Sequence, residues 1–154
     1  MRLAPLTVLM IAGCAVPRSP SPSAGIPLEE RAQALNEVIG VRYGQIGPEP
    51  PLDACAVYLA LDRDPAFAAR LGDFARGKLR PADVAACPAS ADAQRRDHGW
   101  FVRTISRRGR DELTVTADAN AHGGHRETFI LRHGYGDPRL WRVVEVRVTD
   151  FWYE

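Results

Sequence analysis

The stretch Leu113-Thr114-Val115-Thr116-Ala117-Asp118-Ala119-Asn120 decides how the second half of the chain folds. Apolar and polar residues alternate along it, which is typical of a strand with one face on a core. Three more runs rich in β-branched and aromatic residues, at residues 99–107, 125–132 and 140–153, surround residues 111–120 and are separated by glycine-bearing turns. We therefore expect an antiparallel meander of about four strands.

The last run carries apolar residues on both of its faces. Strict alternation would place Val144, Val146 and Val148 on one face, and Trp141, Val143 and Phe151 on the other. We expect part of that second face to be covered as well.

The turn His122-Gly123-Gly124-His125 between the second and third runs offers the only spacing that suggests a metal site. A two-residue Gly-Gly turn would pair the two histidines and bring Asn120 and Glu127 beside them as further ligands. That register would send Phe129 and Leu131 to the polar face.

A register slipped by one residue satisfies the hydrophobic pattern instead. It makes residues 122–124 a three-residue loop with Gly124 in the left-handed conformation, and it puts Phe129 and Leu131 on the face of Leu113 and Val115. We favour this register, which separates the histidines, and predict no metal.

The first half of the chain predicts helices. Leu28 to Tyr43 has apolar residues at helical spacing behind Pro27, and Leu52 to Leu61 is apolar nearly all round, as in a buried helix. Asp64-Pro65 is typical of a helix start; Phe67, Leu71, Phe74 and Lys78 continue one face, and a short turn at residues 80–87 follows. The fold class is therefore α+β, with N-terminal helices packed on a curved antiparallel sheet.

The first fourteen residues have the layout of an export signal: Arg2, an apolar run over residues 6–13, and Cys14. Ile11-Ala12-Gly13-Cys14 resembles the lipobox of bacterial lipoproteins, in which the cysteine receives a lipid and becomes the mature N-terminus. The alternative is an incidental cysteine in an ordinary signal peptide or in a short buried segment. The resemblance implies export and a lipid anchor in a membrane of the bacterial cell envelope.

This interpretation divides the chain into a signal peptide over residues 1–13, the lipidated Cys14 with a Pro/Ser-rich tether over residues 14–25, and one domain over residues 26–154. Two cysteines then remain, Cys55 and Cys87, in a compartment that is oxidising in many bacteria. We expect them to form a disulfide, which would contribute about 3 to 4 kcal/mol by closing a loop of about 30 residues. Two unpaired buried thiols are the alternative.

Composition excludes several classes of partner and chemistry. The 20 Lys and Arg residues nearly balance 19 Asp and Glu residues, for a net charge of +1. No charged field exists to attract nucleic acid. No nucleophile elbow, phosphate-binding loop or zinc helix occurs, and we predict no cofactor.

Four polar residues interrupt otherwise apolar strands and are candidates for facing a ligand: Arg103, His133, Arg142 and Asp150. An anionic or carbonyl-bearing ligand would suit such a set. The alternative is that the apolar part of each side chain lies over the sheet and its polar end is in water.

Helices followed by a long sheet that ends in Trp141-Arg142-Val143-Val144-Glu145-Val146-Arg147-Val148 and Phe151-Trp152-Tyr153 resemble the layout of the NTF2-like superfamily. The resemblance covers residues 28–153 by order of elements and carries no specific motif. It implies a cone that encloses a cavity. No catalytic Asp/His pair of the enzymatic members can be placed on this chain.

Three functions follow as hypotheses. The first is a non-enzymatic lipoprotein whose small α+β domain binds an envelope partner or a small apolar ligand. The second is an acid/base enzyme of the isomerase or dehydratase kind, with His133 or Asp150 as base. The third is a structural accessory subunit of an envelope complex.

Overall fold

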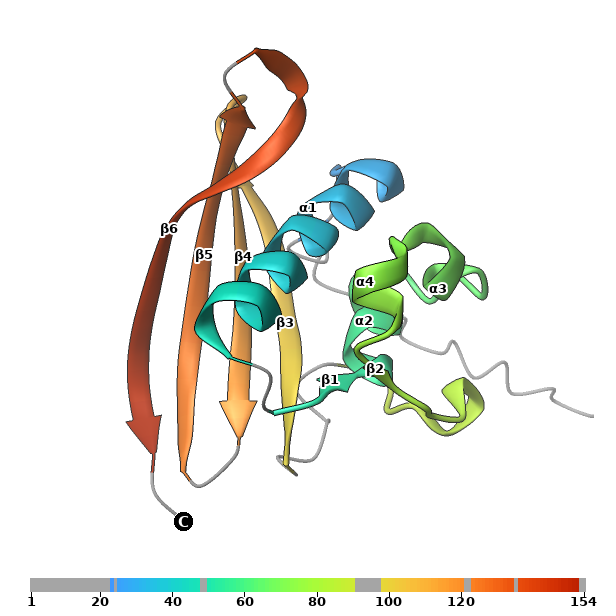
Figure 1. Ribbon diagram of the computed structural model, residues 1–154. Helices are drawn as coiled ribbons and strands as arrows, with labels where there is room; N and C mark the ends of the chain where they lie inside the picture. Colours follow the sequence, from blue (N-terminus) through green and yellow to red (C-terminus); the bar gives the residue numbers. More distant parts are fainter. Residues whose placement is uncertain are drawn as a thin grey trace, which may run out of the picture.

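The computed structural model describes residues 23, 25–47, 50–90, 98–120, 123–134 and 136–152, and for residues 150–152 it describes the backbone alone. The chain forms a curled, six-stranded mixed sheet, and helix α1 (Leu28–Val41) crosses its concave face (Figure 1). Short helices lie beside one edge of the sheet. The expected α+β class and the curved sheet are confirmed.

The sheet has the strand order β2-β1-β3-β4-β5-β6. The four predicted runs form the antiparallel strands β3 (Gly99–Arg108), β4 (Glu112–Asn120), β5 (Gly124–Gly134) and β6 (Asp137–Trp152). The expectation of about four strands is corrected by β1 (Leu52–Asp53) and β2 (Leu79–Arg80), which pair in parallel with each other; β1 also pairs with β3. A two-residue strand has no periodicity that a sequence pattern can reveal.

The hairpin between β4 and β5 has the expected faces but a different loop. Leu113 pairs with Leu131, so the hydrophobic faces coincide as predicted. The loop consists of residues 121–123, and Gly123, with a φ of 117°, takes the positive φ that we expected of Gly124. A shift of two residues leaves every side chain on its face, so the hydrophobic pattern cannot distinguish these two registers.

Strand β6 does not alternate strictly along its length. Val146 pairs with Phe129 and Val143 with Leu131, and the register shifts between these pairs, with Val144 as the extra residue. The bulge brings Val143 and Val146 to the same concave face, where both pack against the core. The expectation that they lie on opposite faces is wrong, because a single inserted residue reverses the alternation.

Helix α1 supplies one side of the core. Its buried apolar residues are Ala32, Ala34, Leu35, Val38 and Ile39, at the spacing of one helix face. After Val41 the chain continues as a π-helical segment, η1 (Arg42–Ile46), rather than remaining α-helical to Tyr43 as predicted. The wider turn makes both Arg42 and Tyr43 buried residues.

The segment after α1 is more broken than expected. Leu52–Asp53 belongs to the sheet, and helix α2 (Ala54–Ala60) follows it with Asp53 as its cap, accepting a hydrogen bond from the Ala56 N–H at 2.9 Å. The predicted continuous helical face becomes two single turns, α3 (Phe67–Arg70) and α4 (Asp73–Arg76). Leu71 between them is extended and buried, and Phe74 is 52 % exposed rather than part of the core.

Cys55 of α2 and Cys87, at the end of the 3₁₀ turn η2 (Val84–Ala86), are joined by a disulfide, as predicted. The two cysteines are 32 residues apart, so the bridge ties η2 to a helix that contacts β3. Within the described residues, no helix combines the length and the apolar character that crossing a membrane requires.

Candidate functional site

The C-terminal end of α1 leads into a buried polar cluster, which we call the η1 cluster: Arg42, Tyr43, Trp100, His125 and Glu127. Glu127 of β5 lies at its centre and is 1 % exposed. Its Oε2 accepts a hydrogen bond from Trp100 Nε1 at 2.8 Å and lies 3.0 Å from Arg42 Nε. Its Oε1 lies 2.9 Å from His125 Nε2. Both carboxylate oxygens are therefore engaged.

Further hydrogen bonds connect the η1 cluster to the backbone around it. Arg42 also donates from Nη1 to the Gly47 carbonyl at 2.9 Å, which closes the π-helical segment. Burial raises the pKa of Tyr43, and its neutral hydroxyl donates to the Pro50 carbonyl at 2.7 Å. A buried ion pair between Arg42 and Glu127, with hydrogen bonds from Trp100 and to Gly47 beside it, has the geometry of a structural connection between helix and sheet.

Two of the residues suggested as metal ligands at the β4–β5 turn, His125 and Glu127, belong to the η1 cluster. His125 and Glu127 do come together, but Trp100 and Arg42 occupy the carboxylate, and His122 lies outside the described residues. Within the part of the chain that the structure describes, no group of three or more His, Cys, Asp or Glu side chains is arranged to hold a metal ion.

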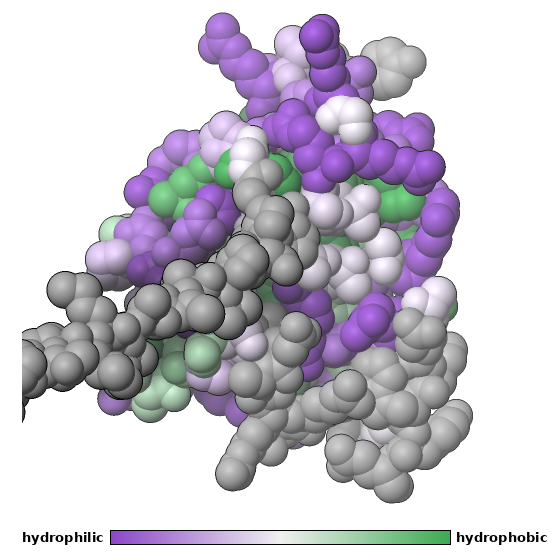
Figure 2. Space-filling model, turned by 180° about the vertical axis from the view of Figure 1, so that it is seen from behind, coloured by the Kyte–Doolittle hydropathy of each residue, from purple (hydrophilic) through white to green (hydrophobic). Residues whose placement is uncertain are grey.

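A second buried carboxylate, Asp118, lies on the convex face of the sheet. Arg103 Nε donates to it at 2.7 Å and Arg126 Nε at 2.8 Å. Burial raises the pKa of Asp118, but the hydrogen bonds and charges of Arg126 and Arg103 outweigh burial and hold it below its usual value of 3.8. Figure 2 shows that hydrophilic side chains predominate on this side of the molecule.

A groove of about 580 Å³, formed by described residues, runs along the N-terminal half of α1. We call it the α1 groove. The helix contributes Glu29, Glu30, Gln33 and Asn36, helix α3 contributes Arg70, and the β5–β6 hairpin contributes His133, Arg139 and Trp141. It is open to solvent, and its walls are as much polar as apolar.

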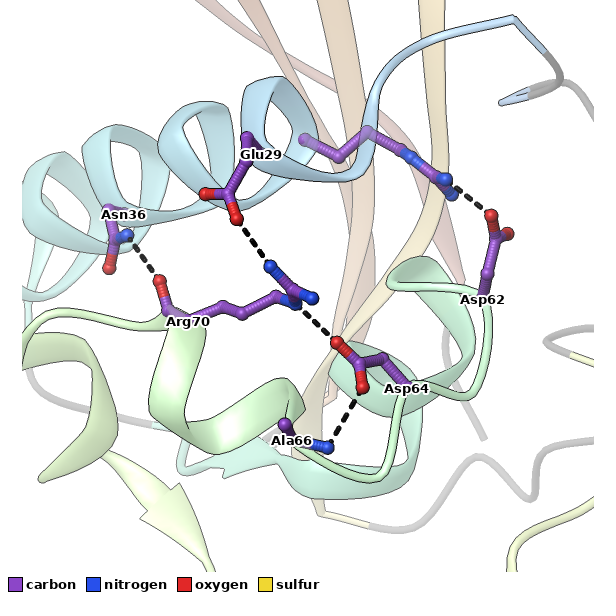
Figure 3. A network of polar contacts seen from close by, with 7 residues as sticks. Glu29, Asn36, Asp62, Asp64, Ala66 and Arg70 are labelled. Carbon is purple, nitrogen blue, oxygen red and sulfur yellow. Dashed lines mark hydrogen bonds and ion pairs between the residues drawn. The ribbon is translucent and has the colours of Figure 1, made fainter.

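One wall of the α1 groove is a network of polar contacts that joins α1 to the segment around α3 (Figure 3). Arg70 forms ion pairs with both Glu29 and Asp64. Asn36 accepts a hydrogen bond from the Gly72 N–H at 2.8 Å and donates to the Arg70 carbonyl at 3.4 Å. The charges on this wall therefore have partners within the protein.

The opposite wall is aromatic and less satisfied. Trp141 Nε1 donates to Glu30 at 3.0 Å, and the His133 ring stacks on Trp141 with 4.1 Å between ring centroids. His133 Nδ1 is shielded from solvent and has no hydrogen-bond partner among the described residues. Within the same residues, the side chains of Gln33 and Arg139 form neither a hydrogen bond nor an ion pair.

The candidate ligand-facing residues do not converge on one place. His133 lines the α1 groove. Arg103 lies on the other face of the sheet with Asp118, and Arg142, 56 % exposed, pairs with Glu37 at 2.9 Å. The side chain of Asp150 and the whole of Cys14 lie outside what the structure describes.

Sequence reasoning missed Gln33 and Arg139. Gln33 is on helix α1 and Arg139 near the start of strand β6, and two residues more than 100 positions apart share no periodic spacing. Comparison with known proteins found no matching family model, no curated protein and no solved structure with significant similarity.

Proposed function

We propose that this protein is a lipid-anchored, non-catalytic binding protein of the bacterial cell envelope, and that its α1 groove holds a small polar ligand with an anionic group. The observation that carries the proposal is the pair Gln33 and Arg139, an amide and a guanidinium that line the same groove without a side-chain partner among the described residues.

The charges around the groove support an anionic ligand. Its acidic residues are engaged: Glu29 by Arg70, and Glu30 by Arg107 and Trp141. Arg139 is the cation at this groove that keeps its donors for a ligand, and guanidinium groups bind carboxylates and phosphates in a planar, two-pronged way. The mixed polar and apolar walls favour such a ligand over the apolar one that the sequence suggests.

The proposed anchor is compatible with a groove at this end of α1. Ile26, buried at 4 % exposure, is the first core residue among those described, and α1 begins two positions later. A tether over residues 15–25 spans at most about 40 Å when fully extended. A ligand in the α1 groove would therefore be held close to the membrane surface.

The NTF2-like layout stays our interpretation of the fold, supported by a helix that crosses a curled sheet. The acid/base enzyme is the weaker alternative. It needs an ionisable group that is available to a substrate. Of the two suggested bases, His133 lines the α1 groove but stacks on Trp141 with its Nδ1 shielded from solvent, and the side chain of Asp150 lies outside the described residues. The buried carboxylates are engaged, Glu127 by Trp100 and Arg42 and Asp118 by two arginines.

Native mass spectrometry of the full chain, extracted in detergent, tests the binding site. We expect the native mass to exceed the denatured mass, which includes any covalent lipid, by the mass of a retained ligand. The Gln33→Ala/Arg139→Ala double variant should lose that excess. The Arg108→Ala/Arg110→Ala control removes two exposed cations elsewhere and should keep it. Equal native and denatured masses for the unsubstituted protein would argue against a retained ligand.

Labelling with an alkyne fatty acid in a bacterial host tests the anchor. The label should appear on the unsubstituted chain and disappear in Cys14→Ser, with release of the protein from the membrane fraction. The Cys55→Ser/Cys87→Ser variant should keep the label, because these cysteines form the disulfide. Label that persists in Cys14→Ser would refute lipidation at this residue.

A further inference from the structure

Strand β6 is an edge strand, and it is the longest strand of the sheet at 16 residues. Within the described residues it pairs with β5 on one side and with no strand on the other, and Figure 1 shows no element beyond it. An edge strand presents a row of backbone N–H and C=O groups that can pair with another strand.

Exposed apolar side chains gather on this strand. The structure has five exposed large hydrophobic residues among those described, and three of them are in β6: Leu140, Val144 and Val148, at 37, 53 and 47 % exposure. The bulge accounts for Val144, because it leaves this residue without a partner in β5. Between residues 140 and 149 this edge carries no lysine or proline, two of the residues that commonly protect an edge strand against pairing.

The sequence of β6 is complementary to itself about one residue. In an antiparallel pair of two copies with a two-fold axis at Val146, Glu145 lies opposite Arg147 of the second copy, and the symmetry repeats this pair. The same register places Val144 opposite Val148, so that the exposed valines cover each other.

Neighbouring registers lack this complementarity. An axis at Glu145 would set two glutamates opposite each other, and an axis at Arg147 would set two arginines opposite each other. In one protomer Glu145 and Arg147 already form an ion pair at 2.6 Å on the same face of the strand. Replacing this ion pair by two ion pairs between the copies therefore needs no large rearrangement.

We propose that two copies of this chain form a homodimer through antiparallel β6–β6 pairing centred on Val146. The two curled sheets then join into one continuous sheet. The dimer does not depend on the ligand proposed for the α1 groove.

Cysteine cross-linking of the full chain tests the pairing. Val146→Cys places the two new thiols directly across the axis, so mild oxidation or a short bis-maleimide should give a product of twice the mass on a non-reducing gel. Thr128→Cys, in the interior strand β5, is the matched control and should stay monomeric. Equal cross-linking of the two variants overturns the proposal.

Charge reversal tests the register. In the Val146→Cys background, Glu145→Arg or Arg147→Glu alone sets like charges opposite each other twice and should lower the dimerisation constant about tenfold or more. The Glu145→Arg/Arg147→Glu double variant restores opposite charges and should recover cross-linking. Single variants that cross-link as well as their parent, or a double variant that fails although its thermal unfolding is unchanged, contradict the proposed register.

Discussion

Glu127 and Asp118 are both almost fully buried carboxylates, at 1 and 2 % exposure, yet they lie on opposite faces of the sheet and join different parts of the chain. Glu127 receives Arg42 from η1, Trp100 from β3 and His125 from its own strand. Asp118 forms ion pairs with Arg103 and Arg126, from the two strands beside it. A buried carboxylate can thus attach a helix to a sheet or secure neighbouring strands within it.

The largest effect should come from the carboxylate that joins the helix to the sheet. Glu127→Ala leaves the Arg42 guanidinium buried without its counterion and should lower the free energy of unfolding by about 3 to 5 kcal/mol. Urea unfolding of the full chain measures this loss. A loss below that of Asp118→Asn would show that Glu127 does not connect helix and sheet in this way.

Asp118→Asn should cost less, about 2 kcal/mol, because the amide keeps one acceptor and the two arginines lie closer to solvent, with Arg126 38 % exposed. The same urea experiment compares the two variants. Asp118→Leu, which removes both acceptors, should be the more destabilising substitution at this position. Equal losses of unfolding free energy in Asp118→Asn and Asp118→Leu would show that the acceptor oxygens of Asp118 do not stabilise the two arginines.

The contribution of Asp118 should depend on pH. Its pKa in the folded protein lies below the usual 3.8, so its stabilisation is present above that value and is lost as pH falls through the folded pKa. The difference in unfolding free energy between the unsubstituted protein and Asp118→Asn should be constant from pH 7 to about 5 and shrink below about pH 4. A difference that grows towards low pH would contradict this sign.

The smallest effect should come from an exposed ion pair on the same convex side. Arg132, 62 % exposed, pairs with Glu112 at 2.9 Å. Arg132→Ala should change the free energy of unfolding by less than about 1 kcal/mol, because solvent screens such pairs. An effect as large as that of Asp118→Asn would mean that burial does not determine how much these ion pairs contribute to stability.

Local patterns predicted most of the elements. The alternation in residues 113–120 identified β4 and its buried face, and helical spacing identified α1 almost to its end. The polar face of β4 was only partly understood, because Asp118 and Asn120 are buried while Thr114 and Thr116 are intermediate. Alternation assigns a face to a side chain, whereas burial of that face depends on what covers it.

The candidate site was predicted less well than the fold. His133 was named as a ligand-facing residue and lines the α1 groove, whereas Arg103 and Arg142 found acidic partners elsewhere. Interruption of an apolar strand by a polar residue is a local signal. It cannot tell whether the residue meets a groove, a carboxylate or water.

The sequence by itself determined the order of helices and strands, the hydrophobic faces of the β4–β5 hairpin and the pairing of Cys55 with Cys87, because these depend on local periodicity or on the few cysteines available. Only the tertiary structure decided the parallel strands β1 and β2, the bulge at Val144, the ion pair between Arg42 and Glu127 and the α1 groove. Each of these depends on how residues from separate segments pack together, and contacts between distant segments leave no period in the sequence.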